Sequence, residues 1–348
     1  YLRVQYNYWQ GVVSLQDFSF TTKLTLEGQS SMLSEHAEKA VDFSGENSNS
    51  IFHMNLTGDK RYWIGSNTDL EYDQNIHAHI FDADGKLVRE QVFSGSTWYG
   101  NRQNLHGFVF TPTQTGRYTV VFTPRYNTNT ATGVLNTILK VGQHTHIEYT
   151  VGGRVDGNLS HLKDLADYTF SLPEKQQLWL DMAGVGYTAQ VMRRSDNQVV
   201  FSKNLEGNNQ YNVGSLFELE AGDYILRLLP TQLVPGAYSF RLLDTNRLPL
   251  LADNEKSTQR AEQGRYALAW QFSGKAGETV LVDIRSTETQ YWSVLDNAGN
   301  IIDSNSNYHK NDNAQKITLP LDGRYILQTH ADINKNTSDI VSAYIRRP

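Results

Sequence analysis

The sequence contains no cysteine. This absence excludes disulfide bonds, thiolate metal sites and a cysteine nucleophile together. Secreted eukaryotic modules of this size usually carry disulfides, whereas long exported bacterial repeats often have none. The composition therefore favours a bacterial source.

Long apolar runs and an excess of positive charge are also missing. No run approaches the roughly 20 apolar residues that a membrane-spanning helix needs. The formal net charge of −6 provides no basic field for phosphate backbones or anionic lipid. We therefore expect no nucleic-acid partner and no membrane insertion within this segment.

Local catalytic motifs are absent as well. The sequence has no G-x-S-x-G elbow, no H-E-x-x-H pair, no G-x-x-x-x-G-K-[ST] loop and no G-x-G-x-x-G fingerprint. We expect a protein that is not an enzyme, although the members of a dispersed triad meet only in three dimensions.

The residues that are present favour β-structure. The chain has 348 residues with 11% aromatics, which suits two to four domains rich in strand formers. Helix content is expected to be very low, because no stretch keeps an i, i+3, i+4, i+7 apolar stripe. The best helical candidate is 30–43, with one or two turns expected.

A Tyr-led strand recurs along the chain. AGDYILRLLPTQLVPGAYSFRLLD (221–244) is typical of two strands joined by a Pro/Gly loop, with Tyr224, Leu226 and Leu228 on the core face. Tyr118 and Tyr325 open the same phrase. The three tyrosines are about 105 residues apart, the length of one β-sandwich domain.

A second phrase lies upstream of each tyrosine. It sets apolar residues on either side of Asp, Asn and Gly, which indicates a hairpin whose turn needs a positive φ. The three copies are IFDADGKLV (80–88), VMRRSDNQVV (191–200) and SVLDNAGNII (293–302).

The repeats predict an all-β chain of three complete β-sandwich modules preceded by the last two strands of a fourth. Residues 1–24 match the closing strand pair, so the chain is expected to be a segment of a longer tandem array. The expected parts are 1–29 (closing strands of a truncated preceding module), 30–143 (module 1), 144–246 (module 2) and 247–348 (module 3).

The closing pair AG-x-Y-x-L-R-L…G-x-Y-S-F-R-L-L-D, together with the Asp/Asn/Gly hairpin, resembles the bacterial pre-peptidase C-terminal domain. It is also similar to related repeats of very large secreted or surface proteins of bacteria, best over 160–348. The resemblance implies tandem jelly-roll-like sandwiches, used as accessory or spacer units, and an extracellular or cell-surface location. Some relatives bind calcium, collagen or polysaccharide, but no ligand residue of theirs aligns here.

Aromatic residues in polar, Gly-rich loops are candidates for ligand binding. Flat exposed rings stack on sugars and anchor protein interfaces. The competing interpretation is that these rings fill the open ends of a sandwich or the junction between modules. Trp292 lies in a predicted strand and is expected in the core. The candidate residues are Tyr6, Tyr8, Trp9, Trp98 and Tyr99.

Metal binding has weaker candidates, and we expect no cofactor. Asp82 and Asp84 resemble the start of a calcium loop, but Lys86 follows where an oxygen ligand belongs, so a plain turn is favoured. His77 and His79 share one face of a strand and could hold zinc or nickel with a third ligand. His144 and His146 repeat this spacing, and a solvent-facing polar pair is the favoured interpretation of both.

Other charged residues are assigned structural roles. Arg3, Arg227 and Arg241 are expected to cover an outer sheet face with their stems. Four carboxylates flank predicted turns, where backbone hydrogen bonding is expected. They are Asp164, Asp167, Asp223 and Asp322.

Three functions remain open. The first is a non-catalytic stalk or scaffold in a large exported bacterial protein of the adhesin or toxin kind, whose partners are its neighbouring modules. The second is binding of polysaccharide or a host surface protein through the loop aromatics. The third is a subunit of an extracellular polymer, joined by strand addition to the incomplete first module.

Overall fold

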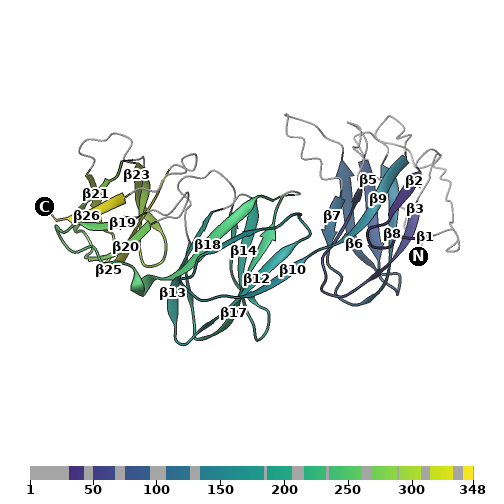
Figure 1. The fold of residues 1–348 in the computed structure, drawn as a ribbon, viewed down its shortest axis with the longest axis horizontal. Helices are drawn as coiled ribbons and strands as arrows, with labels where there is room; N and C mark the ends of the chain where they lie inside the picture. The colour runs from purple at the N-terminus through teal and green to yellow at the C-terminus, as the bar shows by residue number, and fades with distance from the viewer. Residues whose placement is uncertain are drawn as a thin grey trace, which may run out of the picture. The chain divides into compact units, whose positions relative to one another are not determined.

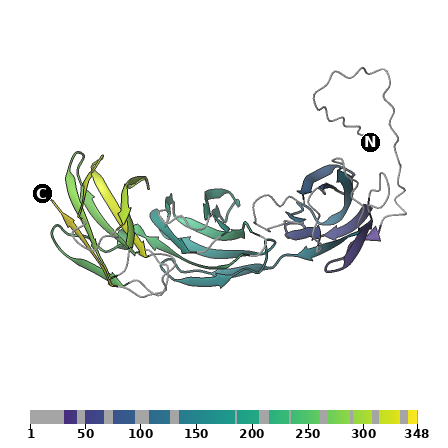
Figure 2. The same ribbon diagram turned by 90° about the horizontal axis from the view of Figure 1, so that it is seen from above.

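The computed structural model is built from strands, which confirms the expected all-β class (Figures 1 and 2). Within the described residues, helical structure consists of one short 3-10 segment, η3 (Thr245–Arg247). None of the helices described is long and apolar enough to cross a membrane. The structure describes residues 31–42, 50–66, 75–94, 107–125, 134–183, 186–205, 215–232, 235–260, 268–287, 290–306, 314–331 and 340–347.

The chain divides into two compact units, which are described separately. The first contains residues 1–57, 66–106 and 114–138, and the second contains 58–65, 107–113 and 139–348.

The first unit contains a five-stranded sheet in the order β1-β3-β8-β5-β6. Strand β1 runs parallel to β3, and the other neighbours in this sheet are antiparallel. Strand β2 pairs antiparallel with β9. The bounds are β1 (Ser31–Met32), β2 (Glu38–Asp42), β3 (Ser50–Leu56), β5 (Asn75–Phe81), β6 (Leu87–Ser94), β8 (Gly116–Arg125) and β9 (Val134–Val141).

The second unit begins with β4 (Tyr62–Ser66) and β7 (Gly107–Phe110), which pair antiparallel. It continues into a sandwich whose sheets have the orders β10-β12-β17-β14-β15 and β11-β18-β13-β16. Its strands are β10 (His144–Glu148), β11 (Val155–Asn158), β12 (Leu165–Leu172), β13 (Gln176–Ala183), β14 (Tyr187–Arg193), β15 (Val199–Leu205), β16 (Ser215–Leu219), β17 (Gly222–Pro230) and β18 (Ala237–Asp244).

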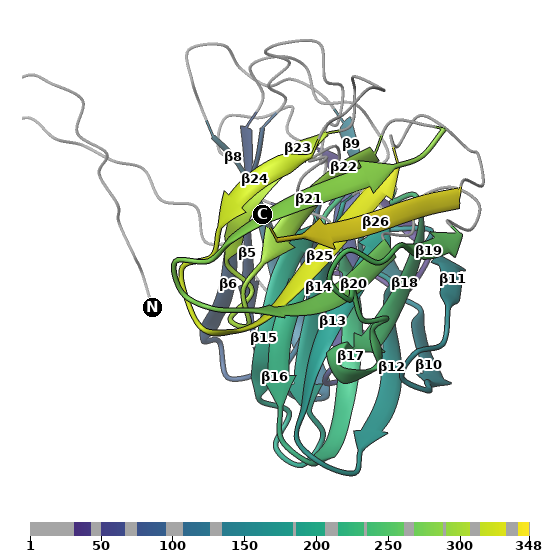
Figure 3. The same cartoon turned by 90° about the vertical axis from the view of Figure 1, so that its left-hand side faces the viewer.

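A further sandwich follows in the same unit, with sheets β20-β25-β22-β23 and β19-β26-β21-β24 (Figure 3). Its strand order repeats that of the preceding sandwich, except that a parallel bridge from Leu250 to Gln271 stands where β10 runs beside β12. Its strands are β19 (Ser257–Arg260), β20 (Leu268–Gly274), β21 (Thr279–Arg285), β22 (Gln290–Leu295), β23 (Ile301–Ser306), β24 (Gln315–Thr318), β25 (Gly323–Ala331) and β26 (Ile340–Arg346).

The predicted core face of β17 is buried. Tyr224, Leu226 and Leu228 are 4%, 0% and 0% exposed, and they belong to the apolar core of their sandwich. Tyr118 on β8 and Tyr325 on β25 are also buried, and so is Trp292 on β22. Alternation along β17 therefore separates core from surface as the sequence predicts, whereas residues 325–329 of β25 are buried on both faces of the strand.

The three Asp/Asn/Gly hairpins share two local features. They join β5 to β6, β14 to β15 and β22 to β23, and each pair has a register shift at the end next to the turn. Each turn contains a residue in the left-handed region, with φ of 77° at Gly85, 57° at Asn197 and 86° at Gly299. The positive φ inferred from the turn residues is confirmed.

The helical expectation for 30–43 is wrong. These residues contain β1 and β2, separated by a turn, instead of helical turns. Helix propensity is a weak preference, and hydrogen bonds to β3 and β9 outweigh it here. The expected closing strands in 1–29 lie outside the described residues, and the module boundaries stay predictions.

Candidate functional site

All the aromatic candidates lie outside the described part of the chain. They are Tyr6, Tyr8, Trp9, Trp98 and Tyr99. Ligand binding by these rings stays a prediction.

The candidate carboxylates of the first hairpin belong to a capped turn. Asp82 Oδ1 accepts hydrogen bonds from the backbone N–H groups of Asp84, at 3.1 Å, and of Lys86, at 2.9 Å. Asp296 Oδ1 accepts the same two bonds in the third hairpin, from the backbone N–H groups of Ala298 and Asn300. In the second hairpin, Asp196 lies late in the turn and accepts one backbone bond, from Gln198. This capping accounts for the aspartate at the start of the first and third turns.

Two histidines and a glutamate meet on the sheet of the first unit. We call His77, His79 and Glu90 the His77 cluster. The two histidines alternate with buried Ala78 on β5, so both lie on the face opposite the core. Glu90 is the partner of His79 across the β5–β6 pairing. Glu90 Oε1 lies 3.8 Å from His77 Nδ1 and 3.5 Å from His79 Nε2.

A second group, the His144 cluster, also combines two histidines with a carboxylate, here an aspartate, but its surroundings differ. His144 and His146 lie on β10, and Asp167 is opposite His146 on β12. His144 Nε2 lies 2.8 Å from Asp167 Oδ2, and Arg227 donates to both Asp167 oxygens at 2.7 Å. An arginine fork therefore already neutralises this carboxylate.

The turn role expected for Asp167 is wrong, because this residue lies within a strand and is 1% exposed. Burial acts to raise its pKa, but hydrogen bonds from Arg227 and His144 outweigh burial and leave the pKa lowered. Burial also lowers the pKa of His144, although Asp167 opposes this shift. Arg241 likewise pairs with buried Asp181, at 2.7 Å.

The two sandwiches of the second unit share an apolar cluster, which we call the junction cluster. It joins side chains of β13, β20, β22 and β25 to the segment after η3. Its buried members are Trp179, Leu248, Ala269, Leu295 and Ile326, with Leu216 and Leu243 partly buried against it.

Arg324 on β25 connects the same two sandwiches through polar contacts. Its guanidinium donates to Gln177 Oε1 at 2.5 Å, to Thr245 Oγ1 at 2.9 Å and to Asn246 Oδ1 at 2.6 Å. Gln177 in turn donates from Nε2 to the carbonyl of Asn297. One arginine thus contacts β13 and the linker between the sandwiches together.

The linker itself is attached to the sandwich that follows it. Gln271 on β20 donates from Nε2 to the carbonyl of Leu248 at 2.7 Å. The backbone of Leu251 donates to the carbonyl of Gln271, and the Leu251 side chain is part of the core. This segment is therefore fixed by both backbone bonds and burial.

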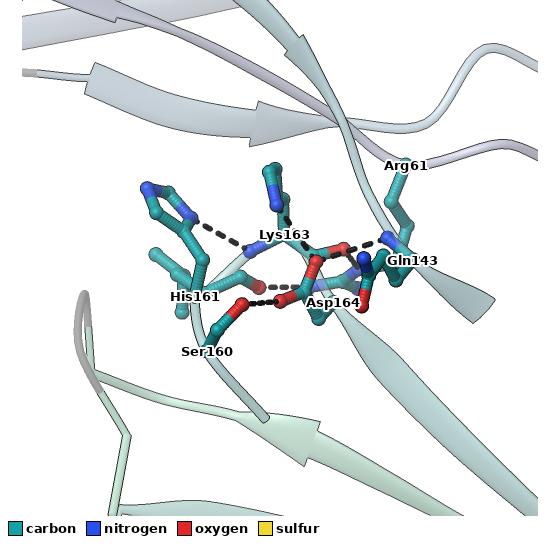
Figure 4. A network of polar contacts seen from close by, with 7 residues as sticks. Arg61, Gln143, Ser160, His161, Lys163 and Asp164 are labelled. Carbon is teal, nitrogen blue, oxygen red and sulfur yellow. Dashed lines mark hydrogen bonds and ion pairs between the residues drawn. The ribbon is translucent and has the colours of Figure 1, made fainter. Parts of the chain in front are cut away.

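A second polar network lies around residues 160–164 of the same unit (Figure 4). Arg61 donates from Nε to the carbonyl of Lys163 at 3.1 Å and from Nη2 to the carbonyl of Leu162 at 2.9 Å. Asp164 accepts from the backbone N–H of Gln143, at 2.9 Å, so its backbone bond joins it to a segment 21 residues away and not to the turn beside it.

His161 packs beside this network with its ring edge-on to Trp63, at a centroid distance of 5.1 Å. Burial lowers the pKa of His161 to about 4, and the positive charge of Lys163 adds to the shift. The imidazole is therefore neutral at neutral pH.

Sequence reasoning missed the residues that join the sandwiches. Trp179 and Ile326 lie on strands whose alternate residues fill the cores, so their own faces point away from the core. The sequence signal for such a contact is a large apolar side chain on the strand face that points away from the core. This signal is hidden in LWL (178–180) and YILQ (325–328), because both resemble continuous buried runs. For Arg324 the residue type alone does not indicate a contact between sandwiches.

Comparisons with known proteins identify no family. No family model matches the sequence, and no curated protein matches it. Among solved structures, the pre-peptidase C-terminal domain of collagenase from Bacillus anthracis has 17% sequence identity, with 29% of this chain and 95% of that chain covered and a TM-score of 0.25. The CUB1-EGF-CUB2 domain of human MASP-1/3 has 8% identity, with 59% and 98% covered and a TM-score of 0.20.

TM-scores this low carry no argument about function. The strand pairings themselves establish a chain of tandem β-sandwiches.

Proposed function

We propose that this chain is a non-catalytic stalk or scaffold segment, in which tandem β-sandwiches keep more distant parts of a larger protein at a fixed spacing. The observation that carries the proposal is the junction between the two sandwiches of the second unit. A flexible string of domains needs no such contacts, because polar linkers alone would connect it.

The junction supports this role through two kinds of contact. Burial of Trp179, Leu295 and Ile326 away from water favours one arrangement of the sandwiches. Hydrogen bonds from Arg324 to Gln177 and Thr245 are directional, so they favour one orientation as well. Together these contacts oppose bending at residues 245–251.

We place this segment in an exported bacterial protein, of the adhesin or toxin kind, that acts outside the cell or on its surface. The absence of cysteine and the resemblance of the repeated Tyr and hairpin phrases to pre-peptidase C-terminal repeats support this placement. The partners of the segment would then be its neighbouring modules.

The test is whether the two sandwiches tumble as one body. ¹⁵N relaxation on the full chain should give the two sandwiches of the second unit the same rotational correlation time. Arg324→Ala combined with Ile326→Ser should make the two times differ, and the matched control Arg193→Ala, which removes an ion pair within a hairpin, should not. Independent tumbling of the sandwiches in the unchanged protein would reject the stalk role.

A further inference from the structure

The His77 cluster has the composition of a transition-metal site. Two imidazole nitrogens and one carboxylate oxygen, from His77, His79 and Glu90, lie within 4.8 Å of one another. Nitrogen-rich sets of this kind suit zinc and its neighbours among the divalent transition metals, whereas calcium and magnesium prefer oxygen ligands. The chemical class of the ligand follows from these donors.

The distances fit a metal without rearrangement of the backbone. A tetrahedral zinc ion with bonds of about 2.0 to 2.1 Å holds its donors about 3.4 Å apart. Glu90 Oε1 lies 3.5 Å from His79 Nε2 and 3.8 Å from His77 Nδ1. Small side-chain rotations therefore bring these donors to bonding separation.

The sheet holds the three side chains in this arrangement. His79 pairs with Val121 on β8 on one side and with Glu90 on β6 on the other, so its strand is held from both directions. The rings of His77 and His79 are stacked with an interplanar angle of 15°. A site on paired strands loses less entropy on binding than a site on a loop.

Access to the cluster is open. The side chains of His77, His79 and Glu90 are 21%, 29% and 49% exposed. A metal held by these three donors would keep a coordination position for water or another ligand, as three-ligand zinc sites do.

The His144 cluster provides an internal comparison. It repeats the histidine spacing and the cross-strand carboxylate, but both oxygens of Asp167 accept hydrogen bonds from Arg227. The positive guanidinium opposes a second cation at this place. In the His77 cluster, the carboxylate instead faces the two imidazoles.

We propose that His77, His79 and Glu90 form a binding site for one divalent transition-metal ion of the zinc class, on the outer face of the five-stranded sheet of the first unit. A bound metal ion links β6, at the edge of this sheet, to its neighbour β5. It therefore stabilises this part of the fold by mass action.

The test is calorimetric titration of the metal-stripped full chain with Zn²⁺ at pH 7.5. The expected result is one saturable site that is weakened at least about tenfold by each of His77→Gln, His79→Gln and Glu90→Gln. The matched control His146→Gln, at the equivalent position of the His144 cluster, leaves the titration unchanged.

Circular dichroism confirms that each variant is folded, and visible absorption of bound Co²⁺ reports the geometry. Two outcomes overturn the proposal. One is the absence of saturable Zn²⁺ binding by the unchanged protein, and the other is Zn²⁺ binding that survives the double variant His77→Gln/His79→Gln. Neither outcome depends on how the sandwiches tumble, so the result is separate from the test of the stalk role.

Discussion

The hydroxyl of Tyr224 donates a hydrogen bond of 2.9 Å to the carbonyl of Glu220, four residues earlier in the chain. Tyr118 makes the same bond to Gln114, and Tyr325 makes it to Leu321. Each tyrosine therefore fills the core with its ring and fastens the turn before its strand with its hydroxyl. This double role explains why tyrosine and not phenylalanine is the first core residue of each of these strands.

Replacing these tyrosines by phenylalanine should destabilise the protein by removing the hydroxyl bond. We expect Tyr224→Phe to cost about 1 kcal/mol of unfolding free energy, measured by urea denaturation. Tyr325→Phe should cost more, because the Tyr325 hydroxyl also accepts a bond from the backbone N–H of Leu321, at 3.1 Å. Equal stability of both variants and the unchanged protein would show that the hydroxyls contribute nothing.

The ion pair between Asp167 and Arg227 should matter most when only one partner is removed. Asp167→Asn leaves the guanidinium without its countercharge in a half-buried place, so we expect a loss of about 3 to 5 kcal/mol. The double change Asp167→Leu/Arg227→Leu should cost much less, because no charge remains to be desolvated. Denaturation of Asp167→Leu, Arg227→Leu and the double variant measures the coupling energy, and additive losses would contradict the prediction.

Acidification should weaken the fold through the same carboxylate. The pKa of Asp167 is lowered in the folded state, so its contribution is present above the unfolded pKa, about 3.9, and is lost as the pH falls through the folded value. As the pH falls below about 4, Asp167→Leu/Arg227→Leu should therefore lose less unfolding free energy than the unchanged protein. Parallel curves of unfolding free energy against pH would be inconsistent with this account.

His161 should give a separate pH response at higher pH. Its folded pKa of about 4 lies below the unfolded value of about 6.5. Its contribution is thus complete above about 6.5 and decreases as the pH falls towards 4. The NMR titration of the His161 ring should have its midpoint near 4, and His161→Gln should reduce the pH dependence of stability in this window. A midpoint near 6.5 would refute the shift.

Gly157 should not tolerate a side chain. A Cβ atom at Gly157 would lie 2.4 Å from the ring of Tyr238, its partner across the β11–β18 pairing. Gly157→Ala must displace this ring and its bond of 2.6 Å to the hydroxyl of Tyr168, so we expect a cost of about 1 to 3 kcal/mol. Gly116→Ala is the matched control, since nothing lies within 4 Å of its Cβ position. Similar thermal midpoints for the two variants would rule out the overlap.

Features set by short stretches of sequence were predicted correctly. The hairpin turns depend on the conformational freedom of residues such as Gly85 and Asn197 and on an aspartate within four residues. The buried face of β17 depends on alternation alone. Both kinds of information are local, so they are visible before any strand is paired.

Contacts between distant strands could not be predicted in this way. Arg227 and Asp167 are 60 residues apart, and Glu90 becomes a partner of His79 only through the register of β5 and β6. A shift of that register by one residue would turn Glu90 to the opposite face. The third member of the His77 cluster therefore depends on pairing geometry, which composition and spacing do not contain.

The parallel edge strand has a mechanical consequence. Residues 144–148 of β10 pair with 165–169 of β12 in the same direction, and the chain enters the sandwich along this edge. A force directed along β10 would load its bonds to β12 in shear, so these bonds would have to fail together. A force that peels an edge strand away from its neighbour, starting at one end, would instead break the hydrogen bonds one at a time. Strand β10 therefore resists a force that acts along its own axis.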